Sequence, residues 1–401
     1  MQTTTEKRTD HRGADQQILG RAEALTYLFP QEMLKPPSVS IVVTNHNYAR
    51  YLPACLRSIA QQTYSRFECV IVDDVSTDDS VDEVRRFLAT KASGGRFRLI
   101  EHEENRGQMA GFKTGLENTS GTFVVFVDSD DVLLPDFIET HLKAHLNGSY
   151  AVAFTCSDQL QIDDDGEVVA STYPQVCKVR DRESGKKPRG LPALLSWTLS
   201  SDDALPLRQQ PQDWAYLPAL SGFVGDWFWS TTSAMMYRRA ALELVLSDDC
   251  DQFCICADYY LVTFSQAVGG SLVIPTVHGA YRRHGQNGFS HSAVVGGEHS
   301  PGNHLTHPPY GKFNESFVRH AVGSFDQFVS VLGTDRAHLL VARFAPKKLF
   351  RKLLLRGPQH RNPLLSRCSL LRQRFFWRTL KVYYALSSRF RFVRNVMTAK
   401  K

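Results

Sequence analysis

The sequence lacks several patterns, and each absence excludes a class of protein. No apolar run approaches the roughly 20 residues of a membrane-spanning helix, so we expect no segment that crosses a bilayer. The first 37 residues are polar and lack the apolar centre of a signal peptide. No Gly-x-Gly-x-x-Gly fingerprint follows a predicted strand, which argues against a dinucleotide-binding oxidoreductase. The eight cysteines have no regular spacing, which favours free thiols in a reducing compartment over a disulfide framework.

Acidic residues are absent from the last part of the chain. Residues 341–401 contain 17 Lys or Arg and no Asp or Glu, which leaves 30 basic against 41 acidic residues in the remainder. Apolar and aromatic residues are interleaved with these bases, as in helices that lie on anionic membrane surfaces. A helical subdomain docked on the acidic remainder is the alternative. Nucleic-acid binding would suit the charge, but no recognised binding motif accompanies it.

Short apolar runs that alternate with helical patterns are present in the first half of the chain. The second helical pattern opens with Ser80 and Glu83, which are spaced as a capping box. Such alternation predicts an α/β fold built on a doubly wound parallel sheet. The predicted strands occupy residues 39–43, 67–72, 97–100 and 122–127.

Polar clusters follow three of these strands at the point where each strand ends. They are Thr44-Asn45, Asp73-Asp74 and residues 128–131, whose sequence is Asp-Ser-Asp-Asp. Ligands of parallel sheets bind beyond the carboxyl ends of the strands, so we expect the clusters to share one site. Carboxylate oxygens are hard ligands suited to Mg²⁺ or Mn²⁺. The alternative for the last cluster is a solvated acidic turn that caps the following helix.

The ordered motifs resemble those of the family 2 inverting glycosyltransferases of GT-A fold. The resemblance is dense over residues 38–150 and resumes around residues 230–290. It implies a GT-A (Rossmann-like) nucleotide-binding sheet with mostly parallel strands, plus a C-terminal basic helical appendage. The motifs that carry it are residues 39–47, 72–80, 105–107 and 126–131. The implied regions are a polar extension (1–37), a catalytic domain (38–312, divided into a nucleotide-sugar half, 38–150, and an acceptor half, 151–312) and a basic helical region (313–401).

The resemblance also implies roles for the strand-end residues. Asp74 would accept a hydrogen bond from the uracil N3–H, and Asp128 and Asp130 would hold a metal ion on the donor diphosphate. Arg106 would touch the donor or remain a solvated loop residue. Lys113 stands where the family often has Asn, which departs from the pattern of donor contacts. The remaining predicted nucleotide-sugar contacts are Thr44, Asn45, Asn47, Asp73 and Ser129.

The second half of the chain should supply the general base and a further metal ligand. Asp258 resembles the base of the family's Asp-Tyr segment, although Ala257 replaces the acid that precedes it; a helix N-cap is the alternative role. His284 lies in a segment that resembles the family's Arg-x-His-x-x-Asn loop. It would complete the metal shell or contact the diphosphate, while Arg282 or Arg283 would offset phosphate charge.

The intervening segment carries fewer signals. Residues 163–166 predict a hairpin turn with no catalytic part. Trp227 and Trp229 point to one side of a predicted strand. They would contact the sugar acceptor or, as paired tryptophans often do, pack in the core.

The predicted function is that of a metal-dependent inverting glycosyltransferase, of the hexosyl or N-acetylhexosaminyl type, with Mn²⁺ or Mg²⁺ as cofactor. Its donor would be a nucleotide-sugar, first of all a UDP-sugar. Its acceptor would be a saccharide or lipid-linked saccharide in envelope or polysaccharide synthesis. We expect a cytoplasmic protein, attached peripherally to the inner face of the membrane through residues 341–401. The alternative is a catalytically silent, glycosyltransferase-like scaffold recruited by the same basic tail.

Overall fold

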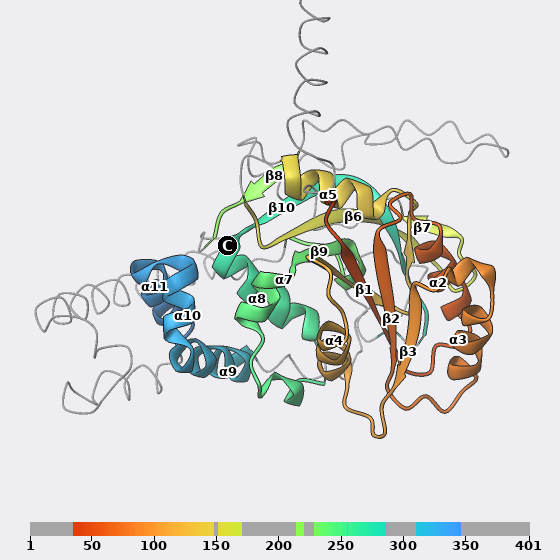
Figure 1. Ribbon diagram of the computed structural model, residues 1–401, viewed down its shortest axis with the longest axis horizontal. Helices are drawn as coiled ribbons and strands as arrows, with labels where there is room; N and C mark the ends of the chain where they lie inside the picture. Colours follow the sequence, from red (N-terminus) through yellow and green to blue (C-terminus); the bar gives the residue numbers. More distant parts are fainter. Residues whose placement is uncertain are drawn as a thin grey trace, which may run out of the picture.

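One mixed sheet organises the parts of the chain that the structure describes (Figure 1). This computed structural model describes residues 35–147, 151–170, 214–219, 228–254, 256–285, 287 and 310–345. The strands within these residues are β1 (Val39–Asn45), β2 (Phe67–Asp73), β3 (Phe97–Glu101), β4 (Phe123–Asp128), β5 (Val132–Leu133), β6 (Phe154–Ile162), β7 (Val168–Ala170), β8 (Ala215–Leu217), β9 (Met235–Arg238) and β10 (Ser271–Arg282). Their order is β3-β2-β1-β4-β9-β6-β10-β5, with β7 beside β6 and β8 beside β10.

Helices connect and cover these strands. The α-helices in the described residues are α2 (Leu52–Ala60), α3 (Ser80–Leu88), α4 (Gln108–Glu117), α5 (Phe137–Asn147), α7 (Arg239–Val245), α8 (Ala257–Gly269), α9 (Tyr310–Gly323), α10 (Phe325–Leu332) and α11 (Thr334–Phe344). Short 3₁₀ turns occur at Lys91–Ser93, Thr232–Ala234 and Cys250–Gln252.

The first four long strands are parallel, as the sequence predicts. β1 pairs in parallel with both β2 and β4, and β2 pairs in parallel with β3. The register sets Asn45 opposite Asp73 and Thr44 opposite Asp128. The predicted strand-end clusters therefore meet at one edge of the sheet, which confirms the predicted α/β arrangement of this half.

The second half of the sheet delivers two more chain segments to the same edge. β9 runs antiparallel to both β4 and β6, so β6 has the direction of β4. β10 pairs in parallel with β6 and is interrupted by an irregularity next to Pro275, a residue tolerated in strands mainly at bulges and edges. The segments that follow β6 and β10 therefore emerge beside the end of β4.

Both faces of the parallel strands are buried. Alternate residues of β1 point to opposite sides, because side chains in a strand have a period of two. Ile41 packs in a cluster with residues of α2, α3 and α5, whereas Val42 packs in another with residues of α4. In Figure 1, α2 and α3 accordingly lie on one side of β1–β3 and α4 lies on the other. Burial on both faces explains why these strands appear in the sequence as continuous apolar runs.

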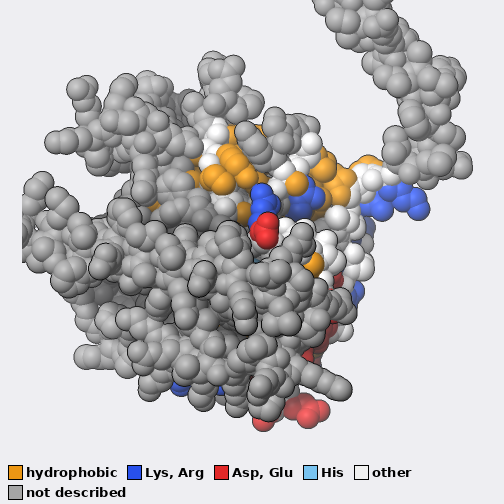
Figure 2. Space-filling model, turned by 90° about the vertical axis from the view of Figure 1, so that its left-hand side faces the viewer, with side chains coloured by type: hydrophobic (Ala, Val, Ile, Leu, Met, Phe, Trp, Pro, Cys, Tyr) orange, Lys and Arg blue, Asp and Glu red, His pale blue; other side chains and the backbone are white. Residues whose placement is uncertain are grey.

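Three helices at the C-terminal end of the described chain pack beside α7 and α8. Phe264 of α8 stacks on Phe317 of α9 with ring centroids 3.9 Å apart, and Phe344 of α11 meets Phe264 edge-on. Figure 2 shows the left-hand side of Figure 1, where described hydrophobic side chains gather beside Lys and Arg. No helix among the described residues is long and apolar enough to cross a membrane. Most of the basic tail (346–401) and nearly all of the polar extension lie outside the described residues.

Candidate active site

Three carboxylates approach one another at the end of β4. Asp128 is the last residue of that strand, Asp130 follows in the turn, and Asp258 comes from the first turn of α8. Burial, followed by the charges of Asp130 and Asp258, raises the pKa of Asp128 to about 7. Gln108 opposes this effect by donating from Nε2 to Asp128 Oδ1 over 2.8 Å. The structure thus brings together acidic residues from distant parts of the chain, as predicted from their motifs.

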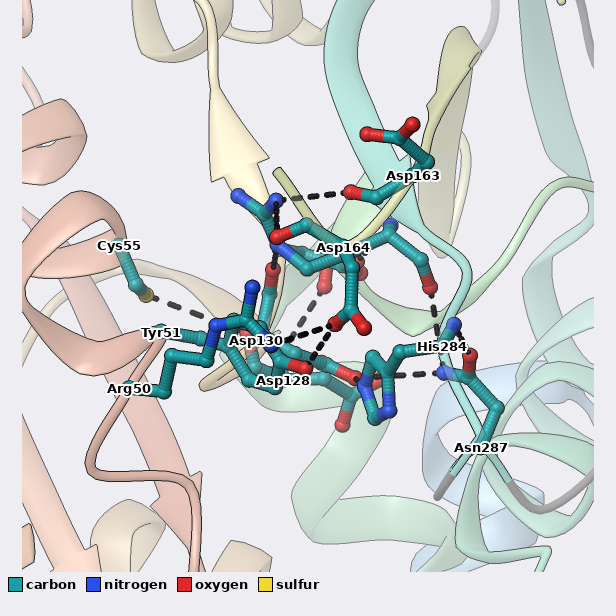
Figure 3. Close-up of polar contacts among 12 residues, drawn as sticks. Arg50, Tyr51, Cys55, Asp128, Asp130, Asp163, Asp164, His284 and Asn287 are labelled. Atoms are coloured by element: carbon teal, nitrogen blue, oxygen red, sulfur yellow. Dashed lines mark hydrogen bonds and ion pairs between the residues drawn. The ribbon is translucent and has the colours of Figure 1, made fainter. Parts of the chain in front are cut away.

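Asp130 contacts the loop that follows β10 (Figure 3). His284 Nε2 lies 2.9 Å from Asp130 Oδ2, and Asn287 Nδ2 donates to the same oxygen at 3.3 Å. The main-chain oxygen of Asp130 accepts from Arg282 Nε at 2.9 Å. Asp130 is 6% exposed and His284 is 3% exposed, so this pair is held in a mostly dry environment.

Asp131 supports the site from beneath. It is fully buried, and its Oδ1 accepts the main-chain N–H of Arg282 at 2.9 Å. Burial, followed by the charges of Asp130 and Asp128, raises the pKa of this carboxyl group well above its usual range. Asp131 therefore ties the end of β10 to the acidic turn.

The donor set suits a hard divalent ion. Among the described residues, no three His, Cys, Asp or Glu side chains form a group that could hold a metal by themselves. Mg²⁺ in nucleotide enzymes is usually bound by one or two carboxylates, with substrate phosphates as the other ligands, so a small protein ligand set fits. Neighbouring ligands of an ion with bonds of about 2.1 Å lie about 3 Å apart. The 2.9 Å between His284 Nε2 and Asp130 Oδ2 matches that separation. The clustered negative charge around Asp128 gives a cation a reason to bind.

Asp258 has the environment expected of a general base. Cys256, with φ 58°, is the N-cap of α8, which excludes the N-cap role for Asp258. Asp258 Oδ1 accepts the N–H of Tyr259 at 2.7 Å. Burial raises the pKa of the carboxyl group of Asp258, and a raised pKa brings a carboxylate closer to the range in which it takes protons efficiently.

Asp74 is fixed by the loop before α4. It accepts the main-chain N–H groups of Arg106 at 2.9 Å and Gly107 at 2.7 Å, and His102 Nδ1 lies 2.8 Å from its Oδ1. A carboxylate has about four acceptor positions, so these three contacts leave capacity for one more donor. The predicted contact with the uracil N3–H is compatible with this geometry.

Several residues that were predicted to contact the nucleotide form hydrogen bonds that hold the loop after β2. Asn45 Nδ2 donates to Asp73 Oδ1 at 2.7 Å, and Ser76 Oγ donates to the same oxygen at 2.6 Å. Asn45 is 3% exposed and Asp73 is 2% exposed, and their side chains help to hold the loop after β2 in place. Asn47 Oδ1 accepts the N–H of Thr77 at 2.7 Å and fastens the same loop from the other side. Direct contact of Asn45 and Asp73 with the nucleotide stays a prediction.

The other predicted nucleotide residues occupy distinct positions. Thr44 lies against α4, where a Cβ on Gly111 would come within 2.9 Å of Thr44 Cγ2. Ser129 is 1% exposed, and its Oγ has no hydrogen-bond partner among the described residues. Arg106 Nη2 lies 3.2 Å from Asp251, and Lys113 Nζ lies 2.7 Å from the same carboxylate. These last two contacts hold the loop before α8 against α4.

The structure gives the positions of some of the tryptophans and arginines that were predicted to act in the second half of the chain. Trp229 is 3% exposed, packs against Phe154 and donates from its indole nitrogen to Ser271 at 2.9 Å, so it belongs to the core rather than to an acceptor surface. Trp227 lies outside the described residues. Arg282 and Arg283 are 5% and 1% exposed and contact protein oxygens, and the role expected for them in offsetting phosphate charge stays a prediction.

The sequence prediction missed the turn between β6 and β7. Residues 163–166 form the expected hairpin turn, but this turn reaches the metal-ligand candidates. Asp164 accepts a hydrogen bond from the Tyr51 hydroxyl, and Tyr51 stacks on His284. Arg282 donates to the main-chain oxygens of Asp163 and Asp164. No motif in the sequence signals these contacts, because they join segments more than one hundred residues apart.

Comparisons with known proteins find similarity to glycosyltransferases. Residues 40–194 match the model of a family described as "Glycosyl transferase family 2". An uncharacterized glycosyltransferase of Nostoc sp. is 27% identical over 65% of this chain and 69% of its own length. The glycosyltransferase GlyA of Streptococcus pneumoniae is 41% identical over 28% of this chain and 15% of its own length. The Escherichia coli enzyme WfgD, a UDP-Glc:α-D-GlcNAc-diphosphoundecaprenol β-1,3-glucosyltransferase by name, is 28% identical over 29% of this chain and 44% of its own length. The chain thus spans well under two thirds of the last two relatives.

Proposed function

We propose that this chain is a metal-dependent, inverting glycosyltransferase that uses a nucleotide-sugar donor, and the match of residues 40–194 to glycosyl transferase family 2 supports this proposal. The chain is a glycosyltransferase with relatives in cell-envelope polysaccharide synthesis. We propose a UDP-sugar as donor and a saccharide or lipid-linked saccharide as acceptor. The WfgD relative supports both choices, because its name pairs UDP-Glc with a lipid diphosphate acceptor.

The observation that carries the proposal is the convergence of Asp128, Asp130 and Asp258. Asp128 and Asp130 stand at the carboxyl end of β4, where ligands of parallel sheets bind, and Asp258 is close enough to raise the pKa of Asp128. Two acidic functions in one site match the two needs of the reaction. One is a cation site for the leaving diphosphate, and the other is a base for the attacking hydroxyl.

Each residue then has a chemical role. Asp128, Asp130 and His284 would hold Mn²⁺ or Mg²⁺, which supplies positive charge to the leaving nucleotide diphosphate. Asp258 accepts the proton of the acceptor hydroxyl as its oxygen attacks the anomeric carbon from the face opposite the leaving group. Asp74 accepts from the nucleobase, with its own position fixed by the N–H groups of Arg106 and Gly107. Inversion follows from a single in-line displacement.

Membrane attachment is the second part of the proposal. Residues 341–401 carry 17 Lys or Arg and no acidic residue. Basic segments are attracted to anionic lipids by about 1 kcal/mol per Lys or Arg near the surface. We therefore assign the protein to the inner face of the cytoplasmic membrane, where a lipid-linked acceptor would be accessible. Loss of sedimentation with anionic vesicles on deletion of residues 346–401 would support this assignment, and unchanged sedimentation would contradict it.

Release of nucleotide diphosphate tests the catalytic proposal. With Mn²⁺ and a lipid-linked or free saccharide acceptor, the wild-type protein should release UDP from at least one UDP-sugar. Asp130→Asn and Asp258→Asn should lower that release. If no UDP-, GDP- or dTDP-sugar yields diphosphate with any acceptor tested, the silent scaffold replaces the enzyme as the better account.

A further inference from the structure

His284 is enclosed by aromatic rings from the segment before α2. Tyr51 stacks on its imidazole with ring centroids 4.7 Å apart and planes at 25°, and Tyr48 meets the same ring edge-on at 5.4 Å and 68°. His284 is 3% exposed, and its Nε2 points to Asp130. Figure 3 shows Tyr51, Asp130 and His284 beside one another.

The orientation of an imidazole needs an external determinant. The χ2 torsion of histidine is broad and roughly two-fold, so the side chain alone does not choose which edge faces a ligand. A stacked ring fixes the plane of the imidazole, and the contact of Nε2 with Asp130 at 2.9 Å selects one of the two ring orientations that share this plane. Tyr51 supplies such a ring on the face of His284.

Tyr51 is itself anchored by the turn between β6 and β7. Its hydroxyl donates to Asp164, and burial followed by this hydrogen bond raises the pKa of Tyr51 to about 12, so the donor keeps its proton. Arg50 Nη1 lies 3.4 Å from the same carboxylate. Arg282 Nη1 donates to the main-chain oxygens of Asp163 and Asp164 at 2.9 and 3.1 Å. Its guanidinium carbon lies 5.2 Å from the centre of the Tyr51 ring.

We propose that Tyr51 is a positioning residue that directs His284 toward Asp130, and that Asp164 anchors Tyr51 for this purpose. The turn between β6 and β7 thereby sets the geometry of the cation site, although it contributes no ligand. This inference rests on the proposed function, in which His284 and Asp130 bind the metal ion.

Calorimetric titration of Mn²⁺ into the full chain is the first test. Tyr51→Leu removes the ring and should weaken the affinity for Mn²⁺ about 3- to 10-fold, a range expected for the loss of one aromatic pair. Tyr51→Phe retains the ring but loses the hydroxyl that bonds to Asp164, so its loss of affinity should be smaller than that of Tyr51→Leu and similar to that of Asp164→Ala. Asp164→Ala should give an intermediate loss of affinity, because it removes the acceptor of the Tyr51 hydroxyl but leaves the ring. The side chain of Asp164 is 45% exposed, so we expect this variant to fold. Asp165→Asn is the matched control, because its side chain contacts Arg50 alone among the described residues and is 80% exposed.

The ring resonances of His284 in the metal-free protein provide the second test. In histidine-labelled protein, the His284 signals are assigned by their loss in His284→Asn. Stacking on Tyr51 should shift them upfield. The shift should disappear in Tyr51→Leu, shrink in both Asp164→Ala and Tyr51→Phe, and persist in Asp165→Asn.

The two tests separate the two claims. If wild-type protein binds no Mn²⁺, the proposed metal dependence fails, while the His284 resonances still decide whether Tyr51 positions the ring. If the wild type binds Mn²⁺ and folded Tyr51→Leu and Asp164→Ala bind it equally well, the positioning role is overturned. Unchanged His284 resonances in these variants would also overturn it.

Discussion

At the scale of single residues, the carboxylates of the site differ in what surrounds them. Asp130 is bonded to His284 and Asn287, whereas the described donors to the Asp258 carboxylate are the N–H of Tyr259 and its own main-chain N–H. An acid with few internal partners is free to take a proton from a substrate. An acid that already faces an imidazole is better placed to share a cation with it.

Substitution of the base should separate chemistry from binding. Asp258→Asn removes the proton acceptor and should lower kcat about 10²- to 10⁴-fold, the usual contribution of a general base. The affinity for UDP in the presence of Mn²⁺ should change far less than kcat, because we assign Asp258 to the acceptor hydroxyl and not to the metal ion or the nucleotide. Steady-state kinetics together with calorimetry would check both quantities. A loss of UDP affinity equal to the loss of kcat would contradict the assignment.

Metal affinity should depend on pH through Asp128. The pKa of this carboxyl group is raised to about 7 by burial and by the charges of Asp130 and Asp258. Protons therefore compete with the cation below pH 7, and the Kd for Mn²⁺ should rise up to about tenfold per pH unit from there. Gln108→Leu removes a donor that lowers this pKa, so the weakening should begin at a higher pH. A Kd that stays constant from pH 8 to pH 6 would refute this prediction.

At the scale of elements, the N-terminus of α4 joins three parts of the site. Arg106 and Gly107 donate to Asp74, Gln108 donates to Asp128, and the N–H of Gln108 reaches the main-chain oxygen of Cys254 at 3.3 Å. The close approach to Cys254 is possible because residue 107 has no side chain. A Cβ there would lie 2.6 Å from Cys254 Cα.

Gly107→Ala should therefore cost more than an ordinary glycine substitution. Gly107 has φ 80°, which costs an alanine about 1–2 kcal/mol, and the clash with Cys254 adds about 1–3 kcal/mol. Gly95→Ala is the matched control, since Gly95 has φ 71° but nothing within 4 Å of its Cβ position. Urea unfolding of both variants should show the larger loss for Gly107→Ala. Equal losses would mean that the loop yields without strain.

The sequence predicted those strands whose positions depend on their own residues. Apolar runs located β1 through β4 within one or two residues, because both faces of these strands are buried. The capping box at Ser80 was wrong, since α3 begins at Ser80 itself and the N–H of that residue donates to Asp78. The spacing of Ser80 and Glu83 alone could not show whether the N–H of Ser80 bonds to Glu83, as in a capping box, or to Asp78.

The contacts that complete the site were beyond the reach of the sequence. The Tyr51–Asp164 bond joins residues 113 positions apart, and it depends on the parallel direction of β6 and β4 across β9. Nothing in the turn sequence of residues 163–166 differs from that of an ordinary hairpin. The same lack of tertiary information explains why Trp229 could not be assigned to the core before its contacts with Phe154 and Ser271 were seen.

At the scale of the whole molecule, buried histidines should make the fold sensitive to acid. Burial lowers the pKa of His145 to about 3, whereas an unfolded histidine has a pKa of about 6.5. The unfolded state therefore binds a proton below pH 6.5 that the folded state refuses, and the free energy of unfolding falls as the pH decreases toward 3. At pH 5 this one residue should cost about 2 kcal/mol relative to pH 7.5.

His145→Gln should reduce that sensitivity. Glutamine retains a donor for the main-chain oxygen of Met236, which His145 Nε2 now reaches at 3.0 Å, but it does not titrate. Urea unfolding at pH 7.5 and pH 5 would compare the two proteins. The variant should lose about 2 kcal/mol less than the wild type between these pH values. The same loss in both proteins would exclude His145 as a source of acid sensitivity.

The central claim is that Asp128 and Asp130 form the cation site of a nucleotide-sugar pocket. Calorimetric titration of UDP into the full chain, with and without Mn²⁺, tests it most directly. The account predicts UDP binding that requires Mn²⁺ and that is lost in Asp130→Asn but retained in Asp165→Asn. Absence of UDP binding, or binding indifferent to both Mn²⁺ and the substitution of Asp130, would contradict it.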